Sequence, residues 1–236
     1  MESHDETDEE VKYKTFPDQK IENLVPSQLV QDIRKYLTNT DVTMVNFVTE
    51  AFYMRLGKGK YELTDETIIV EGHTLHRIRL LRDLLESDDA DTKKSALGGY
   101  VESESNLSQD GSSWIKDDAC VFGDARVSGD AWVYGRARVS GNVSVSGNAM
   151  ICEEAVITDR AQVFGDAKVS GRATLGDNAQ AFGHAQVFDD ADVSGSAHVF
   201  DRAWVFGHAR ISGNALVCGH VSIGEEKSVA GDSVIR

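Results

Sequence analysis

The sequence contains few of the residues that define several common protein classes. Among its 236 residues are two prolines and three cysteines, Cys120, Cys152 and Cys218. Three cysteines are too few for a disulfide-stabilised secreted scaffold, and an odd number leaves at least one of them unpaired. No apolar run approaches the roughly 20 residues of a membrane-spanning helix. The acidic start of the chain also lacks the apolar segment of a secretory signal. We therefore expect a cytoplasmic protein with no membrane partner.

Positive charge is also scarce. Lys and Arg together number 24 against 39 Asp and Glu, which gives a formal net charge of −15 at pH 7. An acidic excess of this size disfavours general affinity for the phosphates of nucleic acids or of anionic membranes, because like charges repel. Proteins that hold long stretches of nucleic acid are therefore excluded as a class.

What the sequence does contain is a six-residue repeat that begins at Asp118. Its first two units read Asp-Ala-Cys-Val-Phe-Gly and Asp-Ala-Arg-Val-Ser-Gly, and the pattern continues without insertion for about twenty units to Ile235. One position is nearly always alanine, and the position two residues later is usually valine or isoleucine. Self-similarity at a fixed spacing is the signature of a solenoid.

The chemistry of each position predicts the geometry of one unit. Residues two apart in a strand point to the same side, so the alanine and the valine both point inward. The Gly, Asp and Asn that follow favour a turn with positive φ. Each hexad is therefore one short strand and one corner, and a coil closes after three hexads. Coils then stack at the strand spacing of about 4.8 Å.

This pattern resembles the hexapeptide-repeat superfamily of left-handed β-helices over residues 112–236. The resemblance implies a mainly β fold: a left-handed parallel β-helix of about six to seven coils, with three strands per coil. Residues three hexads apart form columns, and the charges of one corner column alternate. Each exposed pair contributes only ~0–1 kcal/mol, but together they help to fix the register. That column is Asp118, Arg136, Glu154, Arg172, Asp190 and His208.

Two of the three outward faces carry aromatic side chains. We predict that they form an interface, because contiguous exposed apolar patches usually mark association. A surface for stacking a small molecule and incidental strand aromatics are the alternatives. The predicted interface residues are Phe164, Phe182 and Phe200 on one face and Phe188, Trp204 and Phe206 on another. The three cysteines fall on three different faces, which excludes a disulfide between them.

The N-terminal segments differ from the repeat. Residues 1–17 are acidic and poor in large apolar residues, which is typical of a disordered tail. Residues 18–57 read as a strand and two amphipathic helices, and they resemble the ribbon-helix-helix module, whose members pair their strands in a dimer. The resemblance implies that Lys20, Glu22 and Leu24 occupy the DNA-reading positions. Because Glu22 repels phosphate and Leu24 lacks a donor, we favour dimerisation over DNA binding. A plain helical cap on the solenoid is the remaining alternative.

Residues 58–111 are predicted to connect this segment to the repeat. Thr67–Val70 and Thr74–Arg79, joined by Glu71-Gly72, are typical of a β-hairpin. We expect the connector to cap the first coil. The segment also resembles a block that precedes hexapeptide repeats in uncharacterised phage and prophage proteins. That resemblance implies a phage or mobile-element origin, and hence the cytoplasm of a bacterial host.

The hexapeptide resemblance also raises an enzyme hypothesis. Acyltransferases of this class trimerise and use a His as general base near a subunit boundary. The candidate bases here are His184 and His198. These enzymes usually also extrude a loop or add a C-terminal element, and the repeat shows neither. His184 and His220 are two coils apart, roughly 10 Å, which is too far to share a metal ion. We predict no metal and no cofactor.

The leading hypothesis is therefore a non-enzymatic, oligomeric binding or scaffold protein. It would dimerise through residues 18–57 or trimerise through the β-helix faces, and it would bind a host protein or a small signal, with a role against host defence. The first alternative is a hexapeptide-type acyltransferase. The second is a ribbon-helix-helix regulator that binds DNA.

Overall fold

The computed structural model describes residues 59–84 and 90–236. The predicted acidic tail and the ribbon-helix-helix-like segment, with Lys20, Glu22 and Leu24, lie outside the described residues. Within the described residues, no helix is long and apolar enough to cross a membrane. The two short helices found there are 3₁₀ turns, η1 at Ala90–Thr92 and η2 at Glu104–Asn106.

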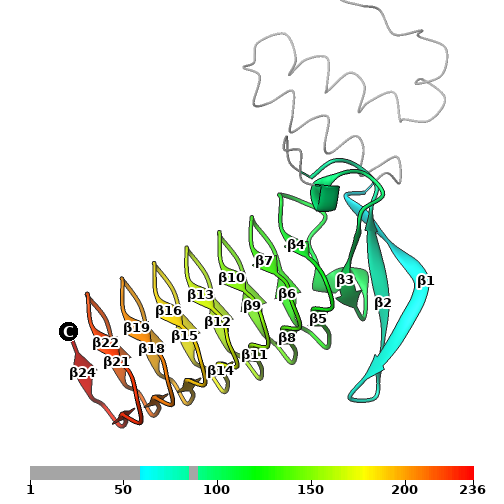
Figure 1. Cartoon of the computed structure of the whole chain (residues 1–236). Helices are drawn as coiled ribbons and strands as arrows, with labels where there is room; N and C mark the ends of the chain where they lie inside the picture. The colour runs from blue at the N-terminus through cyan, green and yellow to red at the C-terminus, as the bar shows by residue number, and fades with distance from the viewer. Residues whose placement is uncertain (1–58, 85–89) are drawn as a thin grey trace, which may run out of the picture. The chain divides into compact units, whose positions relative to one another are not determined.

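The repeat region is a parallel β-solenoid with three sheets (Figure 1). We call the sheets A, B and C. The coil strands of sheet A are β3 Leu97–Val101, β5 Cys120–Val121, β8 Arg138–Val139, β11 Val156–Ile157, β14 Thr174–Leu175, β17 Asp192–Val193, β20 Arg210–Ile211 and β23 Ser228–Val229. Those of sheet B are β6 Arg126–Val127, β9 Ser144–Val145, β12 Gln162–Val163, β15 Gln180–Ala181, β18 His198–Val199, β21 Leu216–Val217 and β24 Val234–Ile235. Those of sheet C are β4 Trp114–Ile115, β7 Trp132–Val133, β10 Met150–Ile151, β13 Lys168–Val169, β16 Gln186–Val187, β19 Trp204–Val205 and β22 Ser222–Ile223.

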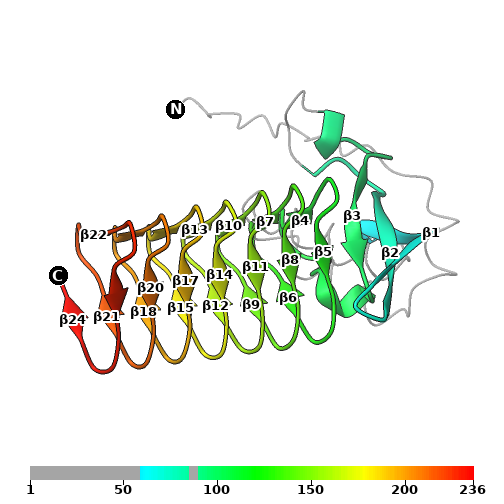
Figure 2. The same cartoon turned by 60° about the horizontal axis from the view of Figure 1, so that its bottom comes forward.

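The predicted coil length of three hexads is confirmed. Trp132 pairs with Met150, and Met150 with Lys168, and the same offset recurs in all three sheets. Both views show the coils following one another along a single axis, from β5 to β24 (Figures 1 and 2). Each strand of the repeat is short because the turn residues that follow every Val or Ile end it.

The solenoid begins earlier than the repeat does. We expected six to seven coils from residue 112, whereas sheet A alone contributes eight coil strands, from β3 to β23. In the first coil Tyr100 pairs with Cys120 and Leu107 bridges to Val127, so both offsets exceed the regular one by two. Trp114 then pairs with Trp132 at the regular offset. The two extra residues lie between Leu107 and Trp114, so the hexad pattern cannot be read there.

The core consists of the two inward positions of each hexad that the sequence predicted. From Ala119 to Ala215 the inward alanines are fully buried, and so are the inward Val, Ile and Leu from Val133 to Val217. Neighbouring coils are also joined by regular backbone hydrogen bonds, such as that from the Trp132 amide to the Ala149 carbonyl, 2.9 Å. In a solenoid the apolar side chains of each coil are buried only by the adjacent coils, and these contacts stabilise the fold.

A β-hairpin precedes the first coil and extends sheet A. β1 (Tyr61–Val70) pairs antiparallel with β2 (His73–Leu80), and β2 pairs antiparallel with β3. The strands are longer than predicted, but the turn is the predicted Glu71-Gly72, with φ of 53° and 88°. Two positive φ values in a two-residue loop are typical of a type I′ turn.

Polar side chains at the start of the hairpin hold the irregular loop of the first coil. Lys60 is 1% exposed, and its ammonium group donates to the Ser113 carbonyl at 2.8 Å and to its hydroxyl at 3.1 Å. The Tyr61 hydroxyl donates to the Glu104 and Leu107 carbonyls at 3.0 and 2.8 Å. Because a buried ammonium needs compensating oxygens, these contacts fix the hairpin to the loop.

Candidate interaction faces

Three phenylalanine rings on sheet B form one continuous stack. Phe164, Phe182 and Phe200 each directly follow a strand of this sheet, in three successive coils. Their ring centroids are 4.8 and 4.9 Å apart, and neighbouring planes differ by 2° and 3°. The solenoid imposes this spacing, since each ring sits one coil above the next. The sequence predicted three exposed rings, but each is half-buried. Phe182 is stacked on both faces, and Phe164 and Phe200 are each stacked on one.

Sheet C carries the second aromatic group. Phe188 and Phe206 stack with centroids 5.2 Å apart, and Trp204 meets Phe188 edge-on at 6.2 Å. The two phenylalanines are half-buried, whereas Trp204 is 45% exposed. One coil further along the column is Gly224, where a side chain would collide with the Phe206 ring. The glycine therefore makes room for that ring.

In the coils that the structure describes, the outward positions of sheets B and C contain no carboxylate. In sheet B the two outward positions of each coil strand read Arg126/Ser128, Ser144/Ser146, Gln162/Phe164, Gln180/Phe182, His198/Phe200, Leu216/Cys218 and Val234/Arg236. In sheet C they read Trp114/Lys116, Trp132/Tyr134, Met150/Cys152, Lys168/Ser170, Gln186/Phe188, Trp204/Phe206 and Ser222/Gly224. In a chain of net charge −15, faces without carboxylates avoid direct acid–acid contact with another acidic surface.

The two candidate bases lie in different settings. His184 is exposed at the corner between sheets B and C, with its Nδ1 3.4 Å from an Asp166 carboxylate oxygen. That carboxylate also accepts a hydrogen bond from Asn148, 2.8 Å. His198 lies on β18, half-buried, with its ring edge-on to Phe182 at 6.3 Å. His184 thus has an acidic partner that could orient its ring, and His198 belongs to the aromatic face.

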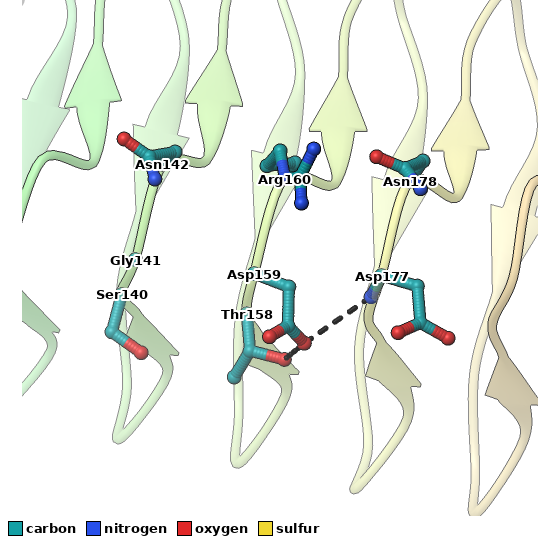
Figure 3. A pocket seen from close by; sticks show the side chains of 8 residues that line it. All are labelled: Ser140, Gly141, Asn142, Thr158, Asp159, Arg160, Asp177 and Asn178. Atoms are coloured by element: carbon teal, nitrogen blue, oxygen red, sulfur yellow. Dashed lines mark hydrogen bonds between the residues drawn. The ribbon is translucent and has the colours of Figure 1, made fainter.

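One hollow lies at the corner between sheets A and B and measures about 450 Å³. Asn142, Arg160 and Asn178 form one row along three coils (Figure 3). Asp159 accepts hydrogen bonds from the Thr158 hydroxyl at 2.8 Å and from a backbone amide of the next coil at 3.2 Å. These contacts lower the pKa of the Asp159 carboxyl, the Thr158 hydrogen bond most. The carboxylate is therefore engaged in holding the corner.

Carboxylates at the corners have a structural role that the sequence analysis missed. Seven Asp or Glu residues of the coils adopt left-handed backbone conformations with φ between 54° and 63°. Six of them accept a hydrogen bond from the amide of the residue one coil further on, as Asp201 does from Gly219 at 3.0 Å. The signal was an acid at a turn position that is glycine in other coils. These seven are Asp117, Glu153, Asp159, Asp177, Asp189, Asp201 and Glu225.

Buried thiols and potential metal ligands complete the inventory of reactive groups. Cys120, Cys152 and Cys218 are free and buried on three different sheets. Burial raises the pKa of the Cys120 thiol, which makes it a poor nucleophile. A hydrogen bond with the Cys152 side chain, and then burial, raise the pKa of Tyr134 to about 12. Across residues 59–84 and 90–236, no three His, Cys, Asp or Glu gather as a metal site would require.

Comparison with known proteins adds one match. Residues 119–135 and 131–147 match the family model of the YdcK β-solenoid repeat. The chain is a β-solenoid repeat protein. The two matched segments overlap and lie in the second and third coils, between β5 and β9. A search of the curated proteins found no match.

Proposed function

We propose that this protein is a non-enzymatic, oligomeric binding or scaffold protein whose rigid solenoid presents the faces of sheets B and C to partners. In this proposal the coil is left-handed, as in the hexapeptide-repeat proteins that the sequence resembles, and the β1–β2 hairpin caps its first coil. Residues 18–57 add a ribbon-helix-helix-like dimerisation segment. In the same proposal the protein acts in the cytoplasm of a bacterial host, as its resemblance to phage proteins implies.

The observation that carries the proposal is the stacked aromatic face. Phe164, Phe182 and Phe200 are held by their own stacking and by the strands that precede them, so little side-chain freedom remains to be lost on binding. Aromatic residues that lose few rotamers are enriched at protein interfaces. A rigid, acid-free face on an acidic rod therefore suits a macromolecular partner.

The shape of the surface favours a protein over a small molecule as the partner of sheet B. The inner ring faces of the stack are occupied by neighbouring rings, which leaves the edges, one face at each end of the stack, and the flanking Gln162, Gln180 and His198 for contact. Small-molecule sites are instead concave and mostly apolar. The described hollows lie at corners and are lined mainly by charged and polar groups, such as Asp159, Arg160 and Arg136.

Sheet C, with its exposed Trp204, is the better candidate for a second partner. Trp204 stands edge-on to Phe188, next to the stacked pair that Phe188 forms with Phe206. A partly exposed Trp beside a fixed apolar patch is typical of residues that dominate binding energy. We therefore assign self-association to sheet B and the host protein or small signal to sheet C.

The test uses the full-length chain and two variants in which an outward residue is replaced by aspartate. Light scattering of the wild-type protein should give a multiple of the 25.8 kDa chain mass. Phe182→Asp on sheet B should reduce that mass, since a carboxylate would be buried in the contact. Ser194→Asp, at the equivalent outward position of sheet A, is the matched control and should leave the mass unchanged. A monomeric wild type, or the same mass for all three proteins, would rule out self-association through sheet B.

A partner of sheet C is tested by capture from host lysate with wild type and with Trp204→Asp. Loss of the same captured protein or bound ligand in the Trp204 variant alone supports the assignment, with Ser194→Asp again as the control. Capture that is equal for all three proteins contradicts it.

A further inference from the structure

The corner between sheets C and A repeats every two coils, whereas the inward Ala and Val positions repeat every coil. Its left-handed position alternates between a carboxylate and a glycine, and the next position alternates between an acid and a base. The acidic coils contribute Asp117-Asp118, Glu153-Glu154, Asp189-Asp190 and Glu225-Glu226. The coils between them contribute Gly135-Arg136, Gly171-Arg172 and Gly207-His208.

The first acid of each pair binds the glycine of the following coil. The amides of Gly135, Gly171 and Gly207 donate to carboxylate oxygens of the preceding coil at 3.0, 2.9 and 3.1 Å respectively. These acceptors are Asp117, Glu153 and Asp189. If the preceding coil had glycine in place of the acid, it would offer no carboxylate acceptor. The hydrogen bond therefore forms only where an acidic coil precedes a glycine coil.

In the two middle pairs the second acid, Glu154 or Asp190, binds the arginine of the preceding coil. Arg136 donates to the Glu154 carboxylate, and Arg172 donates to Asp190 with Nε at 2.7 Å and its terminal nitrogen at 2.9 Å. His208, one coil later, lies 3.8 Å from the same Asp190. The two acidic pairs in the middle of the solenoid, Glu153-Glu154 and Asp189-Asp190, are thus held on both sides by coils of the other kind.

We propose that this corner is a pairing code that specifies which coils stack next to one another, with a structural unit of two coils. The inward Ala and Val columns are nearly identical in every coil, so the core alone barely distinguishes the native stack from one shifted by a coil. A shift of one coil would place acid on acid and base on base, and it would leave the glycine amides without their acceptors. A shift of two coils would preserve every contact. This inference is independent of any binding function of the faces.

The corner between sheets A and B supplies a matched control. Arg160 occupies the position equivalent to Arg172, but its column neighbours are the uncharged Asn142 and Asn178. Arg172→Glu and Arg160→Glu change the net charge of the full chain equally and at equivalent places. We would measure thermal unfolding of both by circular dichroism, in low salt and in 1 M NaCl.

Arg172→Glu should lower the unfolding midpoint by about 2–4 °C more than Arg160→Glu in low salt, because it converts two attractive neighbours into two repulsive ones. The difference should shrink in 1 M NaCl. Adding Asp190→Arg to Arg172→Glu should recover part of the loss, since the neighbour in the next coil then has the opposite sign again. Equal midpoints for the two single variants, or no recovery in the double variant, would overturn the code.

Discussion

Replacing Gly171 by alanine tests how tightly the corners of adjacent coils approach. Gly171 has φ of 70°, and a Cβ added there would lie 2.6 Å from both the amide nitrogen and the carbonyl oxygen of Asp189. Real Cβ atoms almost never approach other atoms within 3.0 Å, and both obstacles are backbone. The coils would have to separate locally, which would weaken the hydrogen bond from the Arg172 amide to the Asp189 carbonyl, 2.6 Å.

The magnitude follows from two separate costs. The left-handed conformation disfavours any L-residue with a Cβ by roughly 1–2 kcal/mol, and forced overpacking adds about 1–3 kcal/mol. Gly171→Ala should therefore reduce the free energy of unfolding by about 2–5 kcal/mol. Gly219 provides the control, because its φ is 75° but the nearest atom to an added Cβ is 3.8 Å away. Gly219→Ala should cost only the conformational part, roughly 1–2 kcal/mol.

Urea unfolding followed by circular dichroism would measure both variants. A third variant, Gly171→Asn, separates the two costs, because Asn tolerates the left-handed region better than Ala but carries the same Cβ. It should remain clearly less stable than the wild type. Equal losses for Gly171→Ala and Gly219→Ala would refute the reasoning, since they would show that the coils separate without cost.

Three further predictions concern the aromatic stack and the hairpin. Phe182→Ala should lower the free energy of unfolding in urea by about 0.5–1.5 kcal/mol more than Phe164→Ala does, because the middle ring stacks on two neighbours and the end ring on one. Equal losses would show that the stacking itself contributes little. Lys60→Met should destabilise the chain by about 2–4 kcal/mol, as the oxygens around the ammonium would be buried without a donor; an unchanged transition would mean that water replaces it. A hydrogen bond with His73, and then one from a backbone amide, lower the pKa of the Glu102 carboxyl. The ionised Glu102 carboxylate therefore stabilises the fold at pH values above the ordinary Glu pKa, and this stabilisation is lost as pH falls through the lowered pKa. Glu102→Gln should flatten the acid side of the profile of stability against pH. An unaltered profile would argue against a stabilising pair of Glu102 and His73.

Much of the fold could be predicted from the sequence because in a solenoid the contacts are set by a fixed offset along the chain. The inward Ala and Val positions, the corners and the three outward faces all follow from a hexad period and a coil of three hexads, and the pairing of Gln162 with Gln180 has this offset. The Glu71-Gly72 turn was also predictable, since its two residues select the loop type locally.

The first coil and the surface details could not be predicted in this way. The two extra residues between Leu107 and Trp114 break the period, and only the pairing of β3 with β5 shows that a coil precedes the repeat. Its loop is held by a buried Lys60, which no periodic pattern marks.

The sequence by itself determined the rod, its coil length and the faces that carry aromatic residues. Tertiary structure alone decided that the phenylalanine rings cover each other's faces and that corner acids hold the backbone of the next coil. The physical reason is distance: a period places residues in a column, but stacking and hydrogen bonding depend on side-chain direction between coils. Those directions become defined only when one coil lies on the next.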